Sequence, residues 1–132
     1  RRPPRSTLFP YTTLFPIWYL DGLIRSIDSK DADKFVSYLA DDAVFSMGEI
    51  PPVTGNENIK NMVAQFFQSI QGLSHTVDSI IEDGNKLVTP GKVTYTRLDG
   101  SQLVVNYCNI YDFVDDKIKY YNVYIDLSQL YK

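Results

Sequence analysis

The 132-residue sequence contains one cysteine, one histidine and one tryptophan. A single cysteine, Cys108, excludes an internal disulfide framework and a cysteine zinc cluster. A single histidine, His75, excludes His-rich metal sites and any mechanism that needs two histidines. Long apolar runs are also missing. Because no stretch of about 20 apolar residues is present, the sequence predicts neither a transmembrane helix nor a membrane partner.

Positive charge is scarce as well. Lysine and arginine number 13 against 16 aspartate and glutamate residues, which leaves a net charge of −3. Domains dedicated to nucleic acids are usually basic, so the charge predicts no nucleic-acid partner. Aromatic residues are abundant, with ten tyrosines and seven phenylalanines, and 44% of the chain is hydrophobic. A chain of this size and composition can bury one sizeable core.

Residues 1–16 differ from the remainder of the chain. They hold four of the seven prolines and three arginines, and Thr-Leu-Phe-Pro occurs twice within them. Pro10 and Pro16 interrupt the apolar core that a secretory signal needs. We expect 1–16 to be a non-native or disordered leader that resembles translated adapter or linker sequence, and 17–132 to be a single cytoplasmic domain. A natural proline-rich arm packed on the domain is the alternative.

The first half of this domain has helical patterns. Apolar spacing predicts helices over 17–27 and 31–39, then a turn at 40–43 and a short strand at 44–47. Residues 48–55, which include Pro51-Pro52, are expected to form a loop. Thr54 and Glu57 fit a capping box, which predicts a third helix that ends at Gly72.

From His75 onward the apolar period becomes that of a strand. Strands are predicted over 75–82, 86–97, 102–114 and 117–126. Pro90-Gly91 indicates a bulge or an edge position, and Asp99-Gly100 indicates a hairpin turn. Helices followed by an antiparallel meander define an α+β fold. Three helices cannot cover both faces of so long a sheet, so we expect it to curl around them and leave a cavity at its open end.

This order of elements resembles the NTF2-like superfamily, and its SnoaL-like branch in particular. The resemblance is carried by residues 38–45 (YLADDAVF), by Gly55, by Asp99-Gly100 and by residues 124–127 (YIDL). It implies a cone of three N-terminal helices packed in a strongly curved, mainly antiparallel sheet, with a pocket for apolar small molecules and, often, a dimer. Relatives include ketosteroid isomerases, limonene-epoxide-type hydrolases, polyketide cyclases and plain binding modules, so function must be argued from the pocket.

Alternation along the strands predicts which side chains face the cavity. The larger and more aromatic face of each strand is assigned to the concave side. The opposite face, with Tyr120, Asn122 and Tyr124, suits a homodimer interface. The expected ligand is an apolar or aromatic small molecule, bound without a cofactor or a metal ion. The predicted ligand-binding residues are Trp18, Tyr19, Phe45, Met47, Tyr95, Tyr107, Asn109, Tyr121 and Val123.

The catalytic residues of two relatives do not carry over to this chain. Arg97-Leu98-Asp99 looks like the R-x-D of the limonene-epoxide-type hydrolases, but Asp99 belongs to a hairpin turn, and three further catalytic positions fall on Val123, Phe45 and Met47. The base position of the ketosteroid isomerases also falls on Met47. Their protonated-aspartate position falls on Asn109, whose amide can donate to a developing oxyanion.

Acid–base chemistry of the polyketide-cyclase type needs a carboxyl group in an apolar cavity. Of four candidates, Asp112 and Asp126 are predicted to face outward. Glu49 and Asp21 are therefore the candidate catalytic residues, with solvated surface carboxylates as the alternative. His75 lies beside a turn and is interpreted as a structural hydrogen-bonding residue.

Two classes of function remain open at this point. The first is an acid–base enzyme, such as a cyclase, isomerase or hydratase, that acts on an apolar substrate. In it Glu49 or Asp21 would carry the proton, and Tyr107, Tyr95 and Asn109 would position an oxygen. The second is a non-catalytic ligand-binding or protein-interaction module. A carboxylate inside the cavity favours the first, and a cavity without a titrating group favours the second.

Overall fold

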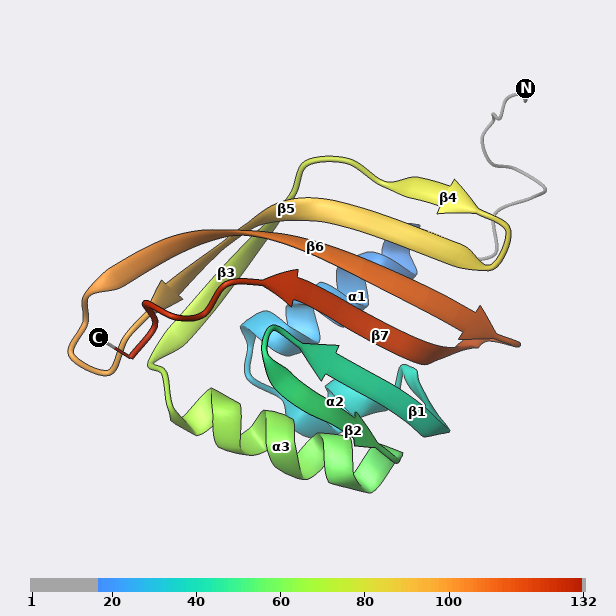
Figure 1. The fold of residues 1–132 in the computed structure, drawn as a ribbon, viewed down its shortest axis with the longest axis horizontal. Coiled ribbons are helices and arrows are strands. Elements are labelled where there is room, and N and C mark those ends of the chain that lie inside the picture. Colours follow the sequence, from blue (N-terminus) through green and yellow to red (C-terminus); the bar gives the residue numbers. More distant parts are fainter. Residues whose placement is uncertain (1–16, 132) are drawn as a thin grey trace.

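The computed structural model describes residues 17–131, so the prediction for residues 1–16 lies outside the described residues. Figure 1 shows the order of the elements along the chain. The helices are α1 (Ile17–Asp28), α2 (Ala32–Val36) and α3 (Asn56–Gln68). The strands are β1 (Leu39–Met47), β2 (Ile50–Thr54), β3 (Gly72–Val77), β4 (Ile81–Asp83), β5 (Lys86–Thr96), β6 (Gln102–Val114) and β7 (Lys117–Ile125). None of the helices in the described part is long and apolar enough to cross a membrane.

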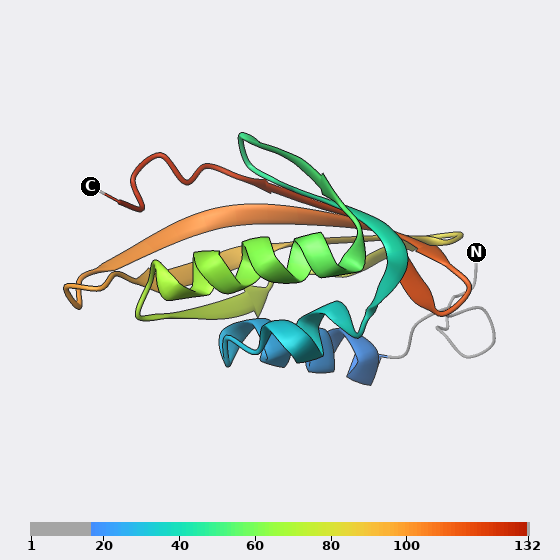
Figure 2. The same ribbon diagram turned by 90° about the horizontal axis from the view of Figure 1, so that it is seen from below.

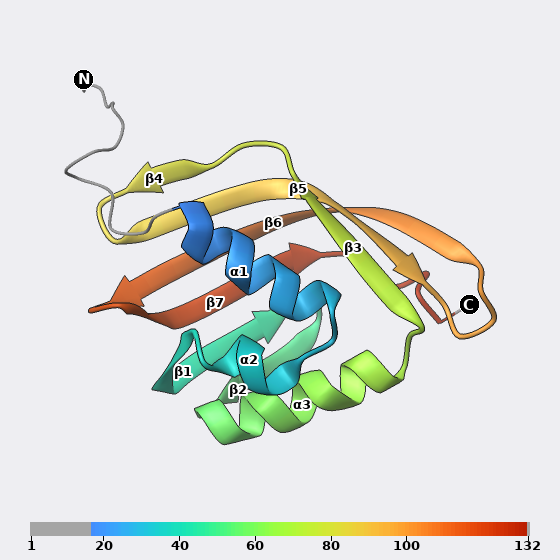
Figure 3. The same cartoon turned by 180° about the vertical axis from the view of Figure 1, so that it is seen from behind.

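The strands form one sheet in the order β2-β1-β7-β6-β5-β3, and β4 pairs with β5. Strands β3, β5, β6 and β7 pair antiparallel, whereas β1 joins β7 in parallel. All three helices lie on the same side of this sheet (Figure 3), and the sheet curves over them (Figure 2). The predicted α+β cone, with three N-terminal helices in a curved and mainly antiparallel sheet, is therefore confirmed.

The second helix is shorter than predicted, and the first strand is longer. Helix α2 ends at Val36, and β1 already begins at Leu39, so residues 40–43 belong to a strand and the predicted turn is wrong. The cause is pairing with the distant strand β7. The Ile118 amide donates to the carbonyl of Tyr38 over 3.0 Å, which takes that carbonyl away from the helix.

The predicted loop at 48–55 contains an additional strand, β2, which includes Pro51 and Pro52. It lies at the edge of the sheet, where a residue without an N–H group is tolerated. The capping box is also wrong, because α3 has Gly55 at its N-cap and no side-chain cap. Thr54 pairs with Val44 in the sheet, and the Thr54 carbonyl accepts a hydrogen bond from the side-chain Nδ2 of Asn58 at 3.0 Å.

The predicted strand 75–82 consists of two strands, β3 and β4, which both pair with β5. Strand β5 runs through Pro90 and Gly91 without a shift of register against β6, so the predicted bulge is absent. Instead, the neighbour on the other side changes here from β3 to β4. A side chain at position 91 would put its Cβ 2.1 Å from the Thr76 carbonyl oxygen and 2.7 Å from the Tyr107 hydroxyl. Glycine at this position therefore allows Tyr107 to cross β5 and donate to the Thr76 carbonyl over 2.9 Å.

The core lies between the helices and the concave face of the sheet. On β6 the predicted inward residues Tyr107, Asn109 and Tyr111 are each at most 5% exposed, whereas Val104 on the other face is 59% exposed. A smaller core cluster, which includes Leu130, packs under the C-terminal segment. The Arg97 guanidinium holds this segment by donating to the Leu130 and Gln129 carbonyls, both at 2.9 Å.

Candidate functional site: an apolar cavity with a histidine–aspartate pair

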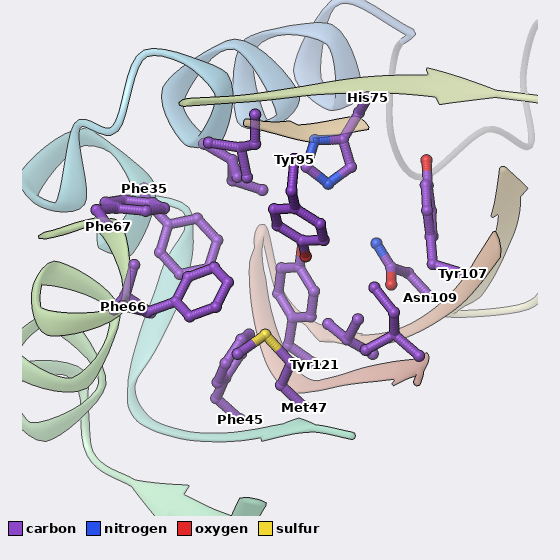
Figure 4. A pocket seen from close by; sticks show the side chains of 15 residues that line it. Phe35, Phe45, Met47, Phe66, Phe67, His75, Tyr95, Tyr107, Asn109 and Tyr121 are labelled. Atoms are coloured by element: carbon purple, nitrogen blue, oxygen red, sulfur yellow. The ribbon is translucent and has the colours of Figure 1, made fainter. Parts of the chain in front are cut away.

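A cavity of about 50 Å³ lies between the helices and the concave face of the sheet. Figure 4 shows that aromatic rings make up most of its wall. The helices contribute only apolar side chains, which are Ile27, Phe35, Val63, Phe66 and Phe67. Pockets for drug-sized molecules usually measure roughly 300 Å³ or more. The cavity as it stands is well below this size, so a ring-sized ligand enters only if side chains of its apolar wall move aside.

Seven of the nine predicted ligand-binding residues line this cavity. They come from β1, β5, β6 and β7 and face the helices, as the alternation of the strands predicted. These residues are Phe45, Met47, Tyr95, Tyr107, Asn109, Tyr121 and Val123. Their contact with a ligand stays a prediction.

Tyr19 does not line the cavity, contrary to our expectation. Its ring packs edge-on against Tyr38 with the centroids 4.9 Å apart, and its hydroxyl donates to the Tyr38 carbonyl over 3.0 Å. The cause is the direction of α1, whose C-terminal half reaches the cavity through Ile27. The N-terminal half lies near the β6–β7 turn, where the Tyr19 hydroxyl also donates to the Asp116 carbonyl at 3.3 Å. The side chain of Trp18 lies outside the described residues.

The two candidate catalytic carboxylates do not lie in the cavity. Asp21 is on the exposed side of α1, where it forms an ion pair with Arg25 one turn later. Glu49 is exposed in the turn between β1 and β2. Contrary to our expectation, neither carboxylate is among the side chains that line the cavity, although Met47, two residues before Glu49, lines it.

A different carboxylate, that of Asp28, is hydrogen-bonded to a histidine of the cavity wall. Nδ1 of His75 lies 2.5 Å from Oδ1 of Asp28, and the His75 backbone N–H donates to Oδ2 of Asp28 over 3.0 Å. Both side chains are largely enclosed, with 11% of His75 and 26% of Asp28 exposed. His75 lines the cavity from β3, and Asp28 is the last residue of α1. The pair thus connects the end of α1 to β3, the edge strand beside β5.

The hydrogen bond to Asp28 determines how the imidazole of His75 can act. A carboxylate only accepts hydrogen bonds, so Nδ1 carries the proton and the lone pair of the neutral ring is on Nε2. Figure 4 shows one ring nitrogen of His75 on the side of α1 and the other towards the cavity. The His75 ring is also held by an edge-on contact with the Tyr107 ring, at 5.3 Å between centroids. The arrangement presents a proton acceptor to an apolar space.

The tyrosines of the cavity remain protonated at neutral pH. Burial raises the pKa of Tyr95 and of Tyr107 above the ordinary tyrosine value, and burial likewise raises the pKa of Tyr121. These hydroxyls are hydrogen-bond donors and not phenolate bases. The neutral imidazole of His75, in contrast, has a lone pair on Nε2 that can accept a proton, and His75 is the only histidine among the described residues. His75 is therefore the group in this cavity best suited to move a proton.

Asn109 is the one amide in the cavity wall. Its Nδ2 donates to the Tyr111 hydroxyl over 3.2 Å, whereas its buried Oδ1 has no hydrogen-bond partner. The sequence led us to expect this amide to donate to a ligand; one of the two Nδ2 hydrogens is used within the protein, and donation by the other stays a prediction. The described residues contain no group of three or more His, Cys, Asp or Glu side chains placed to hold a metal ion.

The hydrogen bonds of His75 agree with its interpretation as a structural hydrogen-bonding residue, but its partner Asp28 was not predicted from the sequence. The two are 47 positions apart, so no local spacing links them. Two signals were nevertheless present. His75 shares a strand face with Leu73 and Val77, which indicates an inward direction. Asp28 ends a helix, where a negative charge opposes the helix dipole and needs a compensating partner.

Comparison with known proteins supports the fold inferred from these elements. A model of the SnoaL-like domain family matches residues 20–121. The crystal structure of TerC with polyporic acid is similar, with 17% identity, a TM-score of 0.77 and coverage of 86% of this chain and 93% of TerC. An LEH-like epoxide hydrolase from M. tuberculosis has 18% identity and a TM-score of 0.74, with 89% and 86% of the two chains covered. An NTF2-like protein from Anabaena variabilis has 19% identity and a TM-score of 0.78, with 92% and 96% covered. A search of curated proteins found no match.

Proposed function

We propose that this chain, which belongs to the SnoaL-like domain family, is an acid–base enzyme. In this proposal His75 moves a proton on a neutral, largely apolar small molecule. The observation that carries the proposal is the His75–Asp28 pair at the wall of the apolar cavity. The similarity to TerC, crystallised with polyporic acid, and to an epoxide hydrolase supports a small organic substrate.

Asp28 and His75 have different tasks in this proposal. Asp28 holds the Nδ1–H of the imidazole, so that Nε2 accepts a proton from a substrate atom in the cavity. The imidazolium that forms is stabilised by the negative charge of Asp28. Nε2 then returns the proton to another atom of the substrate, which leaves the enzyme unchanged. Isomerisation, cyclisation and hydration all contain such a transfer.

The protonated tyrosines supply the complementary interaction. Removal of a proton leaves negative charge on the substrate, usually on an oxygen, and a preorganised donor in a dry site stabilises it. Tyr95 lines the cavity with a hydroxyl that stays protonated, because burial raises its pKa. In the proposal, Nε2 of His75 takes the proton and a tyrosine hydroxyl donates to the oxygen.

Proton exchange into simple ketones tests this function without knowledge of the substrate. The untagged protein is incubated in D2O with cyclohexanone or 2-tetralone, and deuterium at the α-carbon is followed by proton NMR. We expect acceleration over buffer that falls about 100-fold or more in His75→Gln and less in Asp28→Asn. Asp21→Asn and Glu49→Gln are the matched controls and should retain the rate.

Two outcomes contradict the proposal. If His75→Gln exchanges protons as fast as the wild type, another group is the base. If the wild type accelerates exchange in neither ketone, the alternative of a non-catalytic ligand-binding module is favoured. A spectrum of the single histidine provides an independent check, since nitrogen-15 NMR should show the neutral ring protonated on Nδ1.

We also propose that two copies associate through the convex face of the sheet. Val104, Tyr120 and Tyr124 are 59%, 45% and 59% exposed on the neighbouring strands β6 and β7, with Asn122 between the two tyrosines. Exposed aromatic and amide side chains are typical of a wet interface. Light scattering should give the mass of a dimer for the wild type and that of a monomer for Tyr124→Lys, whereas Gln65→Lys on α3 should not change it. A wild type that stays monomeric at 100 µM would refute the dimer.

A further inference from the structure

Asn109 carries a buried hydrogen-bond acceptor that the protein itself does not use. The residue lies on the concave face of β6, is 5% exposed and lines the cavity. Its Oδ1 has no hydrogen-bond partner within the described part of the chain. A buried polar atom without a partner loses its hydration and gains nothing in return. A ligand group that donates a hydrogen bond to such an atom in a cavity wall restores the lost interaction.

The direction of this amide is held by its neighbours. Nδ2 of Asn109 donates to the Tyr111 hydroxyl, and the Thr89 hydroxyl donates to the same oxygen over 3.4 Å. Tyr111 is fully buried, and its ring lies 4.7 Å from the ring of Tyr121, so the hydroxyl that receives the amide is fixed in place. With one Nδ2 hydrogen held by Tyr111, Oδ1 is the buried atom of this amide that has no partner among the described residues.

The wall of the cavity also limits the charge of the ligand. None of the side chains that line it is lysine, arginine, aspartate or glutamate. A carboxylate or phosphate group would find no cation to pair with, apart from a protonated His75. A simple amine, which is positively charged at neutral pH, would find no carboxylate in the wall, because Asp28 lies behind the imidazole. A neutral group with a hydrogen to donate is the one that matches Oδ1, and a hydroxyl is the simplest such group.

We propose that the substrate is a neutral ring compound that carries a hydroxyl group, and that this hydroxyl donates a hydrogen bond to Oδ1 of Asn109. The inference rests on the proposed function, since it names the class of substrate for the same cavity. The hydroxyl is an anchor and not the group that leaves, because an acceptor such as Oδ1 does not help an oxygen to depart. The anchor holds the ring between Asn109 on β6 and His75 on β3, so that a different atom of the substrate faces Nε2.

Three monocyclic probes of similar shape test the anchor in the full chain. Phenol donates a hydrogen bond, anisole only accepts one, and toluene does neither. Their affinities are measured by NMR titration, followed at the side-chain amide signal of Asn109. We expect phenol to bind at least about tenfold tighter than anisole, a ratio typical of one buried hydrogen bond.

Two variants assign this preference to the amide. Asn109→Leu removes Oδ1 at similar size and should bring the ratio of phenol to anisole affinity close to one while toluene still binds. If this variant does not fold, Tyr111→Phe is used, because it removes the partner that directs the amide and should also lower the ratio. Preferred binding of anisole, binding of none of the probes, or a ratio unchanged in the variants would each overturn the proposal.

The test separates this inference from the proposed function. His75→Gln leaves Asn109 and Tyr111 in place, so it should keep the preference for phenol even though it loses proton exchange. Loss of the preference with intact exchange would refute the hydroxyl anchor alone. A phenol preference in a protein without any His75-dependent exchange would refute the catalytic function alone.

Discussion

Asp21 and Asp28 lie two turns apart on the same helix, in surroundings that have little in common. Asp21 is half exposed and pairs with Arg25 on the solvent side of α1. Asp28 is largely enclosed at the end of α1 and accepts two hydrogen bonds from His75. An exposed ion pair contributes about 0–1 kcal/mol to stability, whereas each hydrogen bond to a charged group contributes roughly 1.5–3 kcal/mol. The strand packed against a helix, and not the helix itself, therefore decides which of its carboxylates is enclosed and hydrogen-bonded.

The largest effect is expected where β3 is held against the rest of the sheet. In Gly91→Ala the new Cβ would lie 2.1 Å from the Thr76 carbonyl oxygen, which is backbone and cannot move aside. We expect a loss of about 3 kcal/mol or more in the free energy of unfolding, measured in urea. Gly72→Ala is the matched control, because nothing lies within 4 Å of its added carbon. Equal stability of the two variants would show that β3 is not constrained at Thr76.

A pair of alanine variants tests the comparison of the two carboxylates directly. Asp28→Ala leaves the Nδ1–H and the backbone N–H of His75 without their acceptor, so it should cost about 2–3 kcal/mol. Asp21→Ala should cost less than about 1 kcal/mol, because it removes only an exposed ion pair. Both values come from urea unfolding at pH 7. Equal losses would mean that the side chains of Asp21 and Asp28 contribute equally to the free energy of unfolding.

Alkaline pH should lower the stability of the folded protein through the buried tyrosines of the cavity. Burial raises the pKa of Tyr95 and of Tyr107 above the value of about 10 that tyrosine has in the unfolded chain. The stability that comes from these groups is therefore fully present below pH 10 and is lost as the pH rises above it, because the unfolded chain then ionises first. The melting temperature should fall by several degrees between pH 9 and pH 11, with a shallower fall in Tyr95→Phe. A constant melting temperature over this range would contradict the burial of these hydroxyls.

The smallest effect is expected at the other end of α1. We propose that residues 1–16 are foreign to the domain formed by residues 17–132, so their deletion should leave the melting temperature almost unchanged. Thermal unfolding of the shortened and full chains checks this. A drop of several degrees would show that the segment packs on the domain, and it would give the N-terminal half of α1, with Asp21, a partner.

Local pattern was sufficient for the sheet faces. The alternation along β6 placed Tyr107 and Asn109 inward and Val104 outward, as the structure does. Such a pattern works because every second side chain of a strand faces the same way, whatever its partners are. The start and end of elements were less predictable. The end of α2 depends on Ile118, which is far away in sequence but pairs with β1, and Thr54 lost its capping role to pairing with Val44.

The candidate site was predictable in its wall and not in its chemistry. The wall follows from the strand faces, whereas the His75–Asp28 pair arises from contact between the end of α1 and β3. Sequence alone showed both residues but not their proximity. The same holds for Asn109, whose hydrogen bond to the hydroxyl of Tyr111 could not be read from the sequence. Side chains that act through a neighbour become visible only when that neighbour is placed.

The parallel pairing of β1 with β7 affects how the protein is made. Strand β1 leaves the ribosome early in synthesis, but its central partner β7 follows more than seventy residues later. Until then only the short edge strand β2 can pair with β1. The other edge of β1 has unpaired N–H and C=O groups beside Phe45 and Met47. Contacts of such long sequence separation form slowly, and an open apolar strand can pair with another chain in the meantime. During synthesis, β1 is therefore a segment where the nascent chain needs protection from aggregation.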